Sequence, residues 1–257
     1  MRNFRQQQHR PKKNTLVIGK KAIIEAMEAG KQLERIYLQN NAGGDAIEIV
    51  KKMAAENHVP VNKVPVEKLN SFNAGNHEGC IAVISKVQYQ DLQQVISFVF
   101  DKGETPLFLI LDGITDIRNI GGIARTAYCC GVHAIIIPDK GVGALNEDAI
   151  LTSAGALELI AVCRISNIMT AVEVLHLNGI KLFASEMTAG KKLFEVHLSE
   201  PCAIILGSEE KGITPALLNI ADEAFTIPMT GNFESLNVSV ATGMILYETM
   251  KQRGIAS

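Results

Sequence analysis

Several features that mark common protein classes are missing from this chain of 257 residues. No apolar run approaches the roughly 18 residues of a membrane span, and the charged N-terminus lacks the hydrophobic region of a secretory signal. The five cysteines form no Cys-x-x-Cys pair, so we expect no metal site and a reduced, cytoplasmic protein. The P-loop, the Gly-x-Ser-x-Gly elbow and the His-Glu-x-x-His motif are also absent, which argues against those enzyme classes.

Acidic residues are missing from the first 21 positions, which hold seven lysines and arginines. The rest of the chain therefore has 18 basic against 27 acidic residues, a net charge of −9. A basic flexible tail over residues 1–15 suits contact with a phosphate backbone. A solvated terminus is the more common explanation of so short a charge run. The tail permits nucleic acid as a partner and does not require it.

What is present favours folded α/β structure, since 47% of the residues are hydrophobic and 20% charged. Short helical and extended patterns alternate over residues 16–86 and predict a small α/β unit. Its first helix is expected to end before Gly30 as the C′ residue. A helical pattern over 91–101 and a break at 102–106 place a linker at about 87–105.

Continuous apolar runs characterise residues 106–257. They lie at 107–111, 134–137, 159–162, 182–184, 203–206 and 225–227, and helical patterns separate most of them. Such runs suit strands buried on both faces, which predicts a mostly parallel sheet with helices on each side. Ligands of these sheets bind beyond the carboxyl ends of the strands. The candidate chemistry therefore falls in the loops that follow Leu111, Leu206 and Ile227.

The first loop leads into a helix expected from about Ile120. Asn119 reads equally well as a functional amide or as a plain N-cap of that helix. Arg125 points away from the apolar face, where a guanidinium could bind a phosphate in a forked geometry. The competing interpretation is an ordinary solvent-exposed arginine. Without the other loops, that interpretation of Arg125 would be favoured.

The second and third loops hold small residues beside strand ends. Gly207 directly follows a buried strand and allows a ligand to approach the backbone, and Thr214 with Pro215 predicts the start of the next helix. In the third loop Ser235 is the expected N-cap of a helix that runs to the C-terminus, with Asn237 beside it. Taken alone, this segment fits a ligand entrance and an ordinary capped helix about equally.

A further glycine-bearing stretch, residues 141–146, half resembles a dinucleotide-binding loop. The third glycine of that fingerprint is missing, and residues 138–140 separate the stretch from the preceding strand. We therefore do not expect a Rossmann cofactor loop there.

Taken together, the three loops closely resemble the three motifs of the SpoU (TrmH) family of RNA ribose 2′-O-methyltransferases. The matching segments are Asn119-x-Gly121-x-x-x-Arg125, Leu206-Gly207-Ser208-Glu209 with Gly212, and Ile227-Pro228-Met229 with Ser235-Leu236-Asn237-Val238-Ser239. Their order and spacing fit as well. The resemblance covers about residues 107–251, while residues 16–86 resemble the small ribosomal-protein-like (L30e-like) substrate domain of the RlmB-like group, which methylates a guanosine of 23S rRNA.

This resemblance implies properties that composition and periodicity do not reveal. The α/β methyltransferase domain, residues 106–257, would be of the SPOUT type with a C-terminal trefoil knot, an exception to ordinary chain topology, and would form a homodimer. The knot would hold S-adenosylmethionine. The positions that match its cofactor contacts are Gly207, Ile227, Met229, Ser235 and Leu236, and those that match catalytic or supporting positions are Asn119, Arg125, Glu209, Ser235 and Asn237.

The expected reaction moves a methyl group to a ribose hydroxyl, whose proton must leave. A guanidinium does not normally lose its proton, so we interpret Arg125 as a clamp for the RNA phosphate, with phosphate or water as the proton acceptor. Three alternatives stay open: a tRNA ribose as the target, a non-catalytic RNA- or ribosome-binding protein, and, least favoured, a Rossmann oxidoreductase. The conjunction of Asn119, Arg125, Ser235 and Asn237 counts against the second.

Overall fold

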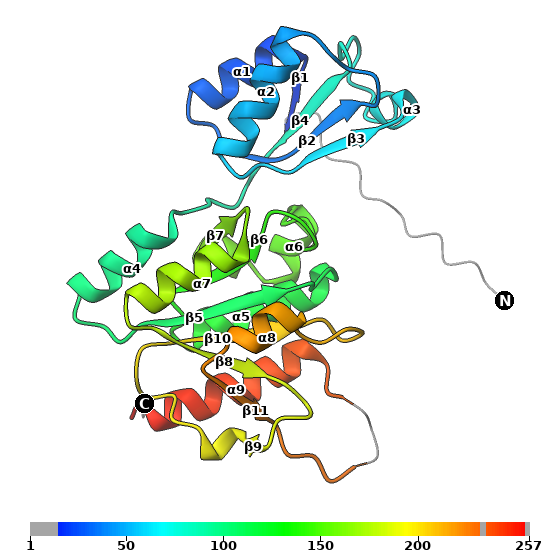
Figure 1. The fold of residues 1–257 in the computed structure, drawn as a ribbon. Coiled ribbons are helices and arrows are strands. Elements are labelled where there is room, and N and C mark those ends of the chain that lie inside the picture. The colour runs from blue at the N-terminus through cyan, green and yellow to red at the C-terminus, as the bar shows by residue number, and fades with distance from the viewer. Residues whose placement is uncertain (1–14, 232–234, 255–257) are drawn as a thin grey trace, which may run out of the picture. The chain divides into compact units, whose positions relative to one another are not determined.

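The computed structural model describes residues 15–231 and 235–254 (Figure 1). The chain divides into two compact units between Ser85 and Lys86. Each unit has hydrophobic clusters of its own. The predicted basic tail lies outside the described residues except for Thr15.

The first unit contains a mixed four-stranded sheet in the order β1-β4-β2-β3. Two helices cover one face through a cluster that includes Ile23, Ile47 and Val50, while Leu69 and Phe72 pack against Ile81 in a separate cluster. Gly30 follows the first helix with φ +73°, as predicted for its C′ position. The elements are β1 (Leu16–Ile18), α1 (Lys20–Glu28), β2 (Leu33–Gln39), α2 (Asp45–Glu56), β3 (Val61–Val64), α3 (Val66–Asn70) and β4 (Cys80–Ile84).

The second unit is built on a seven-stranded sheet in the order β7-β6-β5-β10-β8-β11-β9, and every pair of neighbouring strands is parallel. Residues 107–111 are at most 2% exposed, because helices cover both faces of the central strands. The predicted α/β class and parallel sheet are confirmed. The strands are β5 (Leu107–Asp112), β6 (Ala134–Pro138), β7 (Ala161–Ile165), β8 (Lys181–Ser185), β9 (Lys191–Lys192), β10 (Cys202–Gly207) and β11 (Glu223–Thr226).

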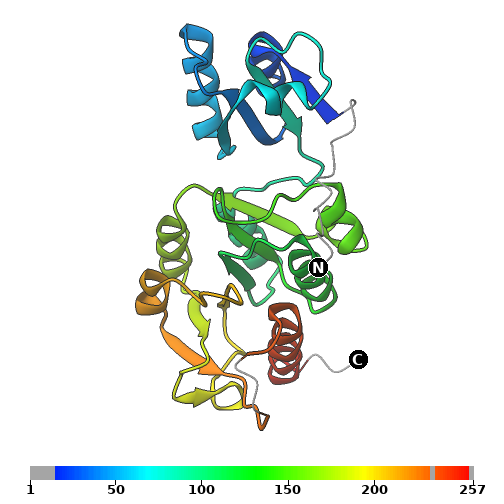
Figure 2. The same ribbon diagram turned by 90° about the vertical axis from the view of Figure 1, so that its right-hand side faces the viewer.

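Two sets of helices form the outer layers of the second unit (Figures 1 and 2). On one face lie α5 (Ile117–Cys129), α6 (Glu147–Thr152) and α9 (Val238–Gln252). On the other lie α4 (Leu92–Asp101), α7 (Ile168–Leu177) and α8 (Pro215–Ile220). Short 3-10 turns, η2 (Ala156–Glu158) and η3 (Leu193–Glu195), complete the unit. The C-terminal helix α9 therefore lies beside α5, although more than 100 residues separate them in sequence.

Two boundaries differ from the sequence expectation. Residues 87–105, predicted as a linker, include α4, whose Leu92, Ile96 and Val99 are buried in the core of the second unit. The segment therefore belongs to that unit, because its apolar helix face packs against the sheet. The strand expected from Leu159 begins at Ala161, and Leu159 is 65% exposed after η2.

Helix α5 begins three residues earlier than predicted, because Asp116 and not Asn119 is its N-cap. The Asp116 Oδ1 atom accepts a hydrogen bond from the Arg118 backbone N–H at 2.8 Å, and Arg118 Nη2 donates to Asp116 Oδ2 at 2.8 Å. These contacts with Arg118, the side-chain hydrogen bond first, lower the pKa of Asp116 below its ordinary value of 3.8.

We predict that Asp116→Ala lowers the free energy of unfolding by about 1 kcal/mol at neutral pH, the usual contribution of an N-cap. Because the pKa of Asp116 is depressed in the folded chain, its stabilisation is present above pH 3.8 and is lost as the pH falls through the folded-state pKa. Urea unfolding of the wild type and the variant at pH 7 and at pH 3 measures this difference. A difference that grows on acidification contradicts the assignment.

Candidate active site

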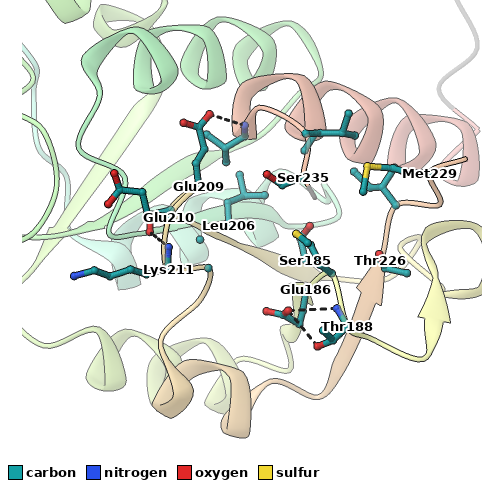
Figure 3. Close-up of a pocket in the computed structure, with 18 residues that line it drawn as sticks. Ser185, Glu186, Thr188, Leu206, Glu209, Glu210, Lys211, Thr226, Met229 and Ser235 are labelled. Carbon is teal, nitrogen blue, oxygen red and sulfur yellow. Dashed lines mark hydrogen bonds between the residues drawn. The ribbon is translucent and has the colours of Figure 1, made fainter. Parts of the chain in front are cut away.

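A pocket of about 370 Å³ lies at the carboxyl ends of β8, β10 and β11 (Figure 3). This volume is within the usual range for small-molecule sites. The wall is formed by residues 185–188, 206–212, 226–227, 229, 235–236, 238 and 241. All five residues predicted to contact a cofactor line it: Gly207, Ile227, Met229, Ser235 and Leu236. The loops expected after Leu206 and Ile227 therefore meet in one cavity.

Gly207 ends β10 at the point where the chain turns back on itself. Ser208 N donates to Gly212 O at 3.1 Å, and Gly212 N donates to Ser208 O at 2.8 Å, which closes a tight loop. A Cβ atom on residue 207 would collide with the backbone of Gly212 and Ile213. Only glycine fits at position 207, because its backbone packs directly against the backbone of Gly212 and Ile213.

The α9 helix begins with Asn237 as its N-cap, which corrects the prediction that Ser235 caps it. Asn237 Oδ1 accepts hydrogen bonds from Ser239 N at 3.0 Å and from Val240 N at 3.4 Å. Ser235 precedes the cap by two residues and lines the pocket instead. An asparagine satisfies the free amides of a first turn as well as a serine does, so the sequence offered two caps of equal quality.

Three of the predicted catalytic residues meet in one hydrogen-bonded cluster, which we call the amide–carboxylate cluster: Asn119, Glu209 and Asn237. Asn237 Nδ2 donates to Glu209 Oε1 at 2.6 Å and to Asn119 Oδ1 at 2.9 Å, and Asn119 Nδ2 donates to Glu209 Oε1 at 3.3 Å. The first residue belongs to α5, the second follows β10 and the third starts α9. Segments 90 and 118 residues apart are thus joined through side chains.

The carboxylate of this cluster sits at the N-terminus of α9. Glu209 Oε1 also faces the Val238 backbone N–H at 3.4 Å (Figure 3). A negative charge at this end of a helix is favourable, because the peptide dipoles and the unpaired amides both point toward it. Glu209 therefore holds both asparagine amides and the helix end in a fixed relation to the pocket.

Glycines bring α5 and α9 close enough for this cluster to form. A Cβ on Gly122 would lie 3.2 Å from Ser239 Cβ, and a Cβ on Gly243 would lie 3.9 Å from Thr126 Cγ2. Larger side chains at Gly122 would push the start of α9 away from α5. The close approach explains why the glycine-containing first turn of α5 belongs to the site.

Arg125 is the one predicted site residue outside both the pocket and the amide–carboxylate cluster. It is exposed on α5, between Gly122 and Thr126, which face α9. Its guanidinium is available to a ligand that approaches from solvent. This placement agrees with the expectation that Arg125 points away from the apolar face of its helix.

The loop after β8 is a third segment that lines the pocket, and it was not identified from the sequence. Residues 185–188 follow β8 and line the cavity with Ser185, Glu186, Met187 and Thr188. The available signal was positional, since a polar segment directly after the buried run Leu182–Ala184 lies at the same sheet edge as the other loops. Asp112 was also missed, and its Oδ2 accepts a hydrogen bond from Thr214 N at 2.6 Å.

The glycine-bearing stretch at 141–146 has a packing role in the structure. A Cβ on Gly143 would collide with the Thr115 carbonyl, so this loop lies directly against the loop that leads into α5. None of its residues lines the pocket. Over residues 15–231 and 235–254, no helix is long and apolar enough to cross a membrane, and no group of metal-ligand side chains is found.

Comparison with known families assigns a description to each unit. Residues 106–247 match the family described as "SpoU rRNA Methylase family", and residues 16–90 match "RNA 2'-O ribose methyltransferase substrate binding". The Bacillus subtilis (strain 168) protein YacO, with the provisional name TrmH family tRNA/rRNA methyltransferase, is 32% identical to this chain over 238 residues. The alignment covers 92% of this chain and 95% of YacO.

Solved structures share the fold of this chain. The SpoU methyltransferase AviRb from Streptomyces viridochromogenes, in complex with the cofactor AdoMet, superposes with a TM-score of 0.60 at 22% identity, covering 94% of this chain and 91% of AviRb. The AdoMet-bound rRNA methyltransferase from Sinorhizobium meliloti gives 0.61 at 20% identity, covering 95% and 88%. At this level of identity the likeness concerns the fold, and the predicted SPOUT-type fold class is confirmed.

Proposed function

The chain belongs to the SpoU rRNA methylase family of RNA methyltransferases, and from this premise we propose that it transfers the methyl group of S-adenosylmethionine to the 2′-oxygen of a ribose in RNA. The observation that carries the proposal is the meeting of the pocket with the amide–carboxylate cluster. Glu209 belongs to both, because it lines the cavity and bonds Asn119 and Asn237.

The pocket fits S-adenosylmethionine in its chemistry. Apolar side chains of Leu206, Ile227 and Leu236 form part of the wall and suit the adenosine half, and Gly207 and Gly212 line the same cavity. Glu209 and Glu186 give the lining negative charge, which suits a cofactor with a sulfonium and an ammonium group. When bound, the cofactor supplies an electrophilic methyl group.

The residues of this chain position the acceptor and stabilise its charge. Asn119 and Asn237, fixed by Glu209, orient the reacting groups in line, since methyl transfer requires near-attack geometry. Arg125 binds the phosphate next to the target ribose. The 2′-oxygen forms a C–O bond as the C–S bond breaks, its proton passes to water or to an RNA phosphate, and S-adenosylhomocysteine leaves. Ser235 serves the loop and the cofactor.

The proposed substrate is a guanosine of 23S rRNA. We assign residues 16–86 to RNA binding and residues 106–257 to methyl transfer, and the match of residues 16–90 to a substrate-binding description supports this division. The name of YacO includes both tRNA and rRNA, so tRNA is the competing substrate class. Tritiated S-adenosylmethionine offered with unmodified 23S rRNA or with unmodified tRNA tests the choice. Transfer to tRNA alone contradicts the rRNA assignment.

We also propose that the chain is a cytoplasmic homodimer. Its five cysteines are free thiols, as expected in a reducing compartment. An apolar surface, which we call the α9 face, is formed on α9 and the neighbouring loops by Phe194, Val240, Met244 and Tyr247, which are 44–71% exposed. They line a shared groove with Pro228. An exposed apolar patch of this kind is typical of an interface.

We predict that Tyr247→Asp converts a dimer into a monomer, because it places a charge on the α9 face at its most exposed apolar side chain. Sedimentation equilibrium of the full chain measures the effect, and Leu177→Asp is the matched control, since Leu177 is 87% exposed on α7 on the other side of the sheet. A dimer that persists in Tyr247→Asp and dissociates in Leu177→Asp contradicts the placement of the interface.

A further inference from the structure

The loop after β8 contains a carboxylate that has so far been given no contact beyond its general negative charge. Glu186 is half-buried and lines the pocket. Its Oε1 atom accepts long hydrogen bonds from Thr188 N at 3.4 Å and from Thr188 Oγ1 at 3.3 Å. Its Oε2 atom forms no hydrogen bond or ion pair with any residue in 15–231 or 235–254. A carboxylate in a pocket with unused acceptor positions is able to accept hydrogen bonds from water or from a ligand that displaces it.

Strand order places this carboxylate on the side of the pocket away from the reacting groups. Strand β10 lies between β5 and β8, and neighbouring strands are about 4.8 Å apart. Glu209 follows β10 and bonds Asn119, which follows β5. Glu186 follows β8, one strand further from β5. In Figure 3, Glu209 points to the start of α9, whereas Glu186 lies beside Thr188 on the opposite side of the pocket.

This arrangement determines which half of the cofactor reaches Glu186. The methyl group must face the amide–carboxylate cluster and Arg125, because the RNA ribose approaches from solvent on that side. The adenosyl half then extends toward β8 and β11, and the pocket offers its base apolar contacts from Leu206 on β10, Ile227 after β11 and Leu236 before α9. The donors of this half are the two ribose hydroxyls and the 6-amino group of adenine, and only the two hydroxyls form a vicinal pair.

A carboxylate suits a vicinal diol, since its two oxygens accept one hydrogen bond from each hydroxyl. Acidic residues near the carboxyl ends of parallel strands recognise ribose hydroxyls in dinucleotide-binding folds in the same way. Gly212, which also lines the pocket, lies close to this carboxylate, since a Cβ added there would be in van der Waals contact with Glu186 Oε2 at 3.7 Å.

We propose that Glu186 recognises the ribose of the adenosyl group by accepting hydrogen bonds from its 2′- and 3′-hydroxyls. The inference deepens the proposed function and rests on it. Glu186 selects adenosyl over deoxyadenosyl ligands, and Glu209 at the other end of the pocket organises the reacting groups.

Calorimetric titration of the full chain with S-adenosylhomocysteine and with its 2′,3′-dideoxyadenosyl analogue tests the proposal. Glu186→Ala is expected to weaken S-adenosylhomocysteine binding about 10- to 100-fold, the range for hydrogen bonds to a charged group. The dideoxy analogue is expected to bind the wild type and Glu186→Ala equally, because it lacks the groups that Glu186 contacts. Glu186→Gln keeps one acceptor oxygen and the side-chain shape. Its affinity for S-adenosylhomocysteine is expected to lie between those of the wild type and Glu186→Ala.

The matched control is Glu173→Ala, which removes an exposed carboxylate on α7 outside the pocket and is expected to leave both affinities unchanged. Equal affinity of the wild type and Glu186→Ala for S-adenosylhomocysteine overturns the inference, as does an equal loss for the dideoxy analogue. A tenfold greater loss for S-adenosylmethionine than for S-adenosylhomocysteine also overturns it, since that result places Glu186 at the sulfonium. Absence of binding by the wild type contradicts the proposed function itself.

Discussion

Arg125→Ala is expected to reduce kcat/KM for RNA methylation about a hundred- to a thousandfold while the affinity for S-adenosylhomocysteine stays unchanged. The guanidinium is exposed on α5 and lies outside the pocket, so its loss does not alter the cofactor wall. It removes the proposed phosphate clamp, and small errors in the position of a reacting group cost about two orders of magnitude in rate. Single-turnover methylation and calorimetry measure the two effects separately.

Arg118→Ala is the matched control for this prediction. Arg118 is an exposed arginine on the same helix, and its guanidinium is paired with Asp116, so we expect less than a threefold change in methylation. Arg125→Lys distinguishes a clamp from a base, because lysine keeps the charge and loses the forked geometry. Near-normal turnover of Arg125→Lys at high pH, with unimpaired RNA affinity, contradicts the clamp and favours proton abstraction by residue 125.

Glu209→Ala is expected to lower kcat about a hundredfold, an effect comparable with the loss of one preorganised polar contact in other enzymes. Glu209 Oε1 is the shared acceptor for Asn119 Nδ2, Asn237 Nδ2 and Val238 N. Without it both amides lose their orientation, and the end of α9 loses a favourable charge. Rapid-quench measurement of methyl transfer at saturating RNA reports this change.

The amide–carboxylate cluster predicts a specific pattern of non-additivity. Residues that act as one unit give a double variant no slower than the worse single variant. We therefore expect Glu209→Ala combined with Asn237→Ala to match the slower single variant. Glu173→Ala, outside the site, is the control whose effect is expected to be negligible. Rate losses that multiply in the double variant contradict a shared role for Glu209 and Asn237.

The fold class was predictable because strands buried on both faces consist of uninterrupted apolar residues. The run Leu107–Leu111 is apolar without alternation, and the structure places it in the middle of a parallel sheet. The order of the strands was not predictable, since β10 inserts between β5 and β8 through contacts among residues some 20 to 100 positions apart. The periodicity of one segment carries no information on its neighbours in a sheet.

The site was predictable in composition and less so in geometry. Gly207, Asn119 and Asn237 were identified from the three loops, and the resemblance indicated that they share a site. Which residue caps α9 depended on hydrogen bonds that Ser235 and Asn237 are both able to make. Glu186 was missed because a single glutamate after a short apolar run resembles any solvated loop residue until the strand order is known.

The chemical position of the transferred methyl group distinguishes methyl transfer to a ribose oxygen of RNA from methylation of a base. After reaction with tritiated S-adenosylmethionine and unmodified 23S rRNA, alkaline hydrolysis cleaves RNA at every free 2′-hydroxyl and spares a 2′-O-methylated linkage. We expect the label in an alkali-stable dinucleotide with the wild type, and at least a hundredfold less of it with Arg125→Ala. Recovery of the label in mononucleotides, as methylated base, contradicts methyl transfer to the ribose.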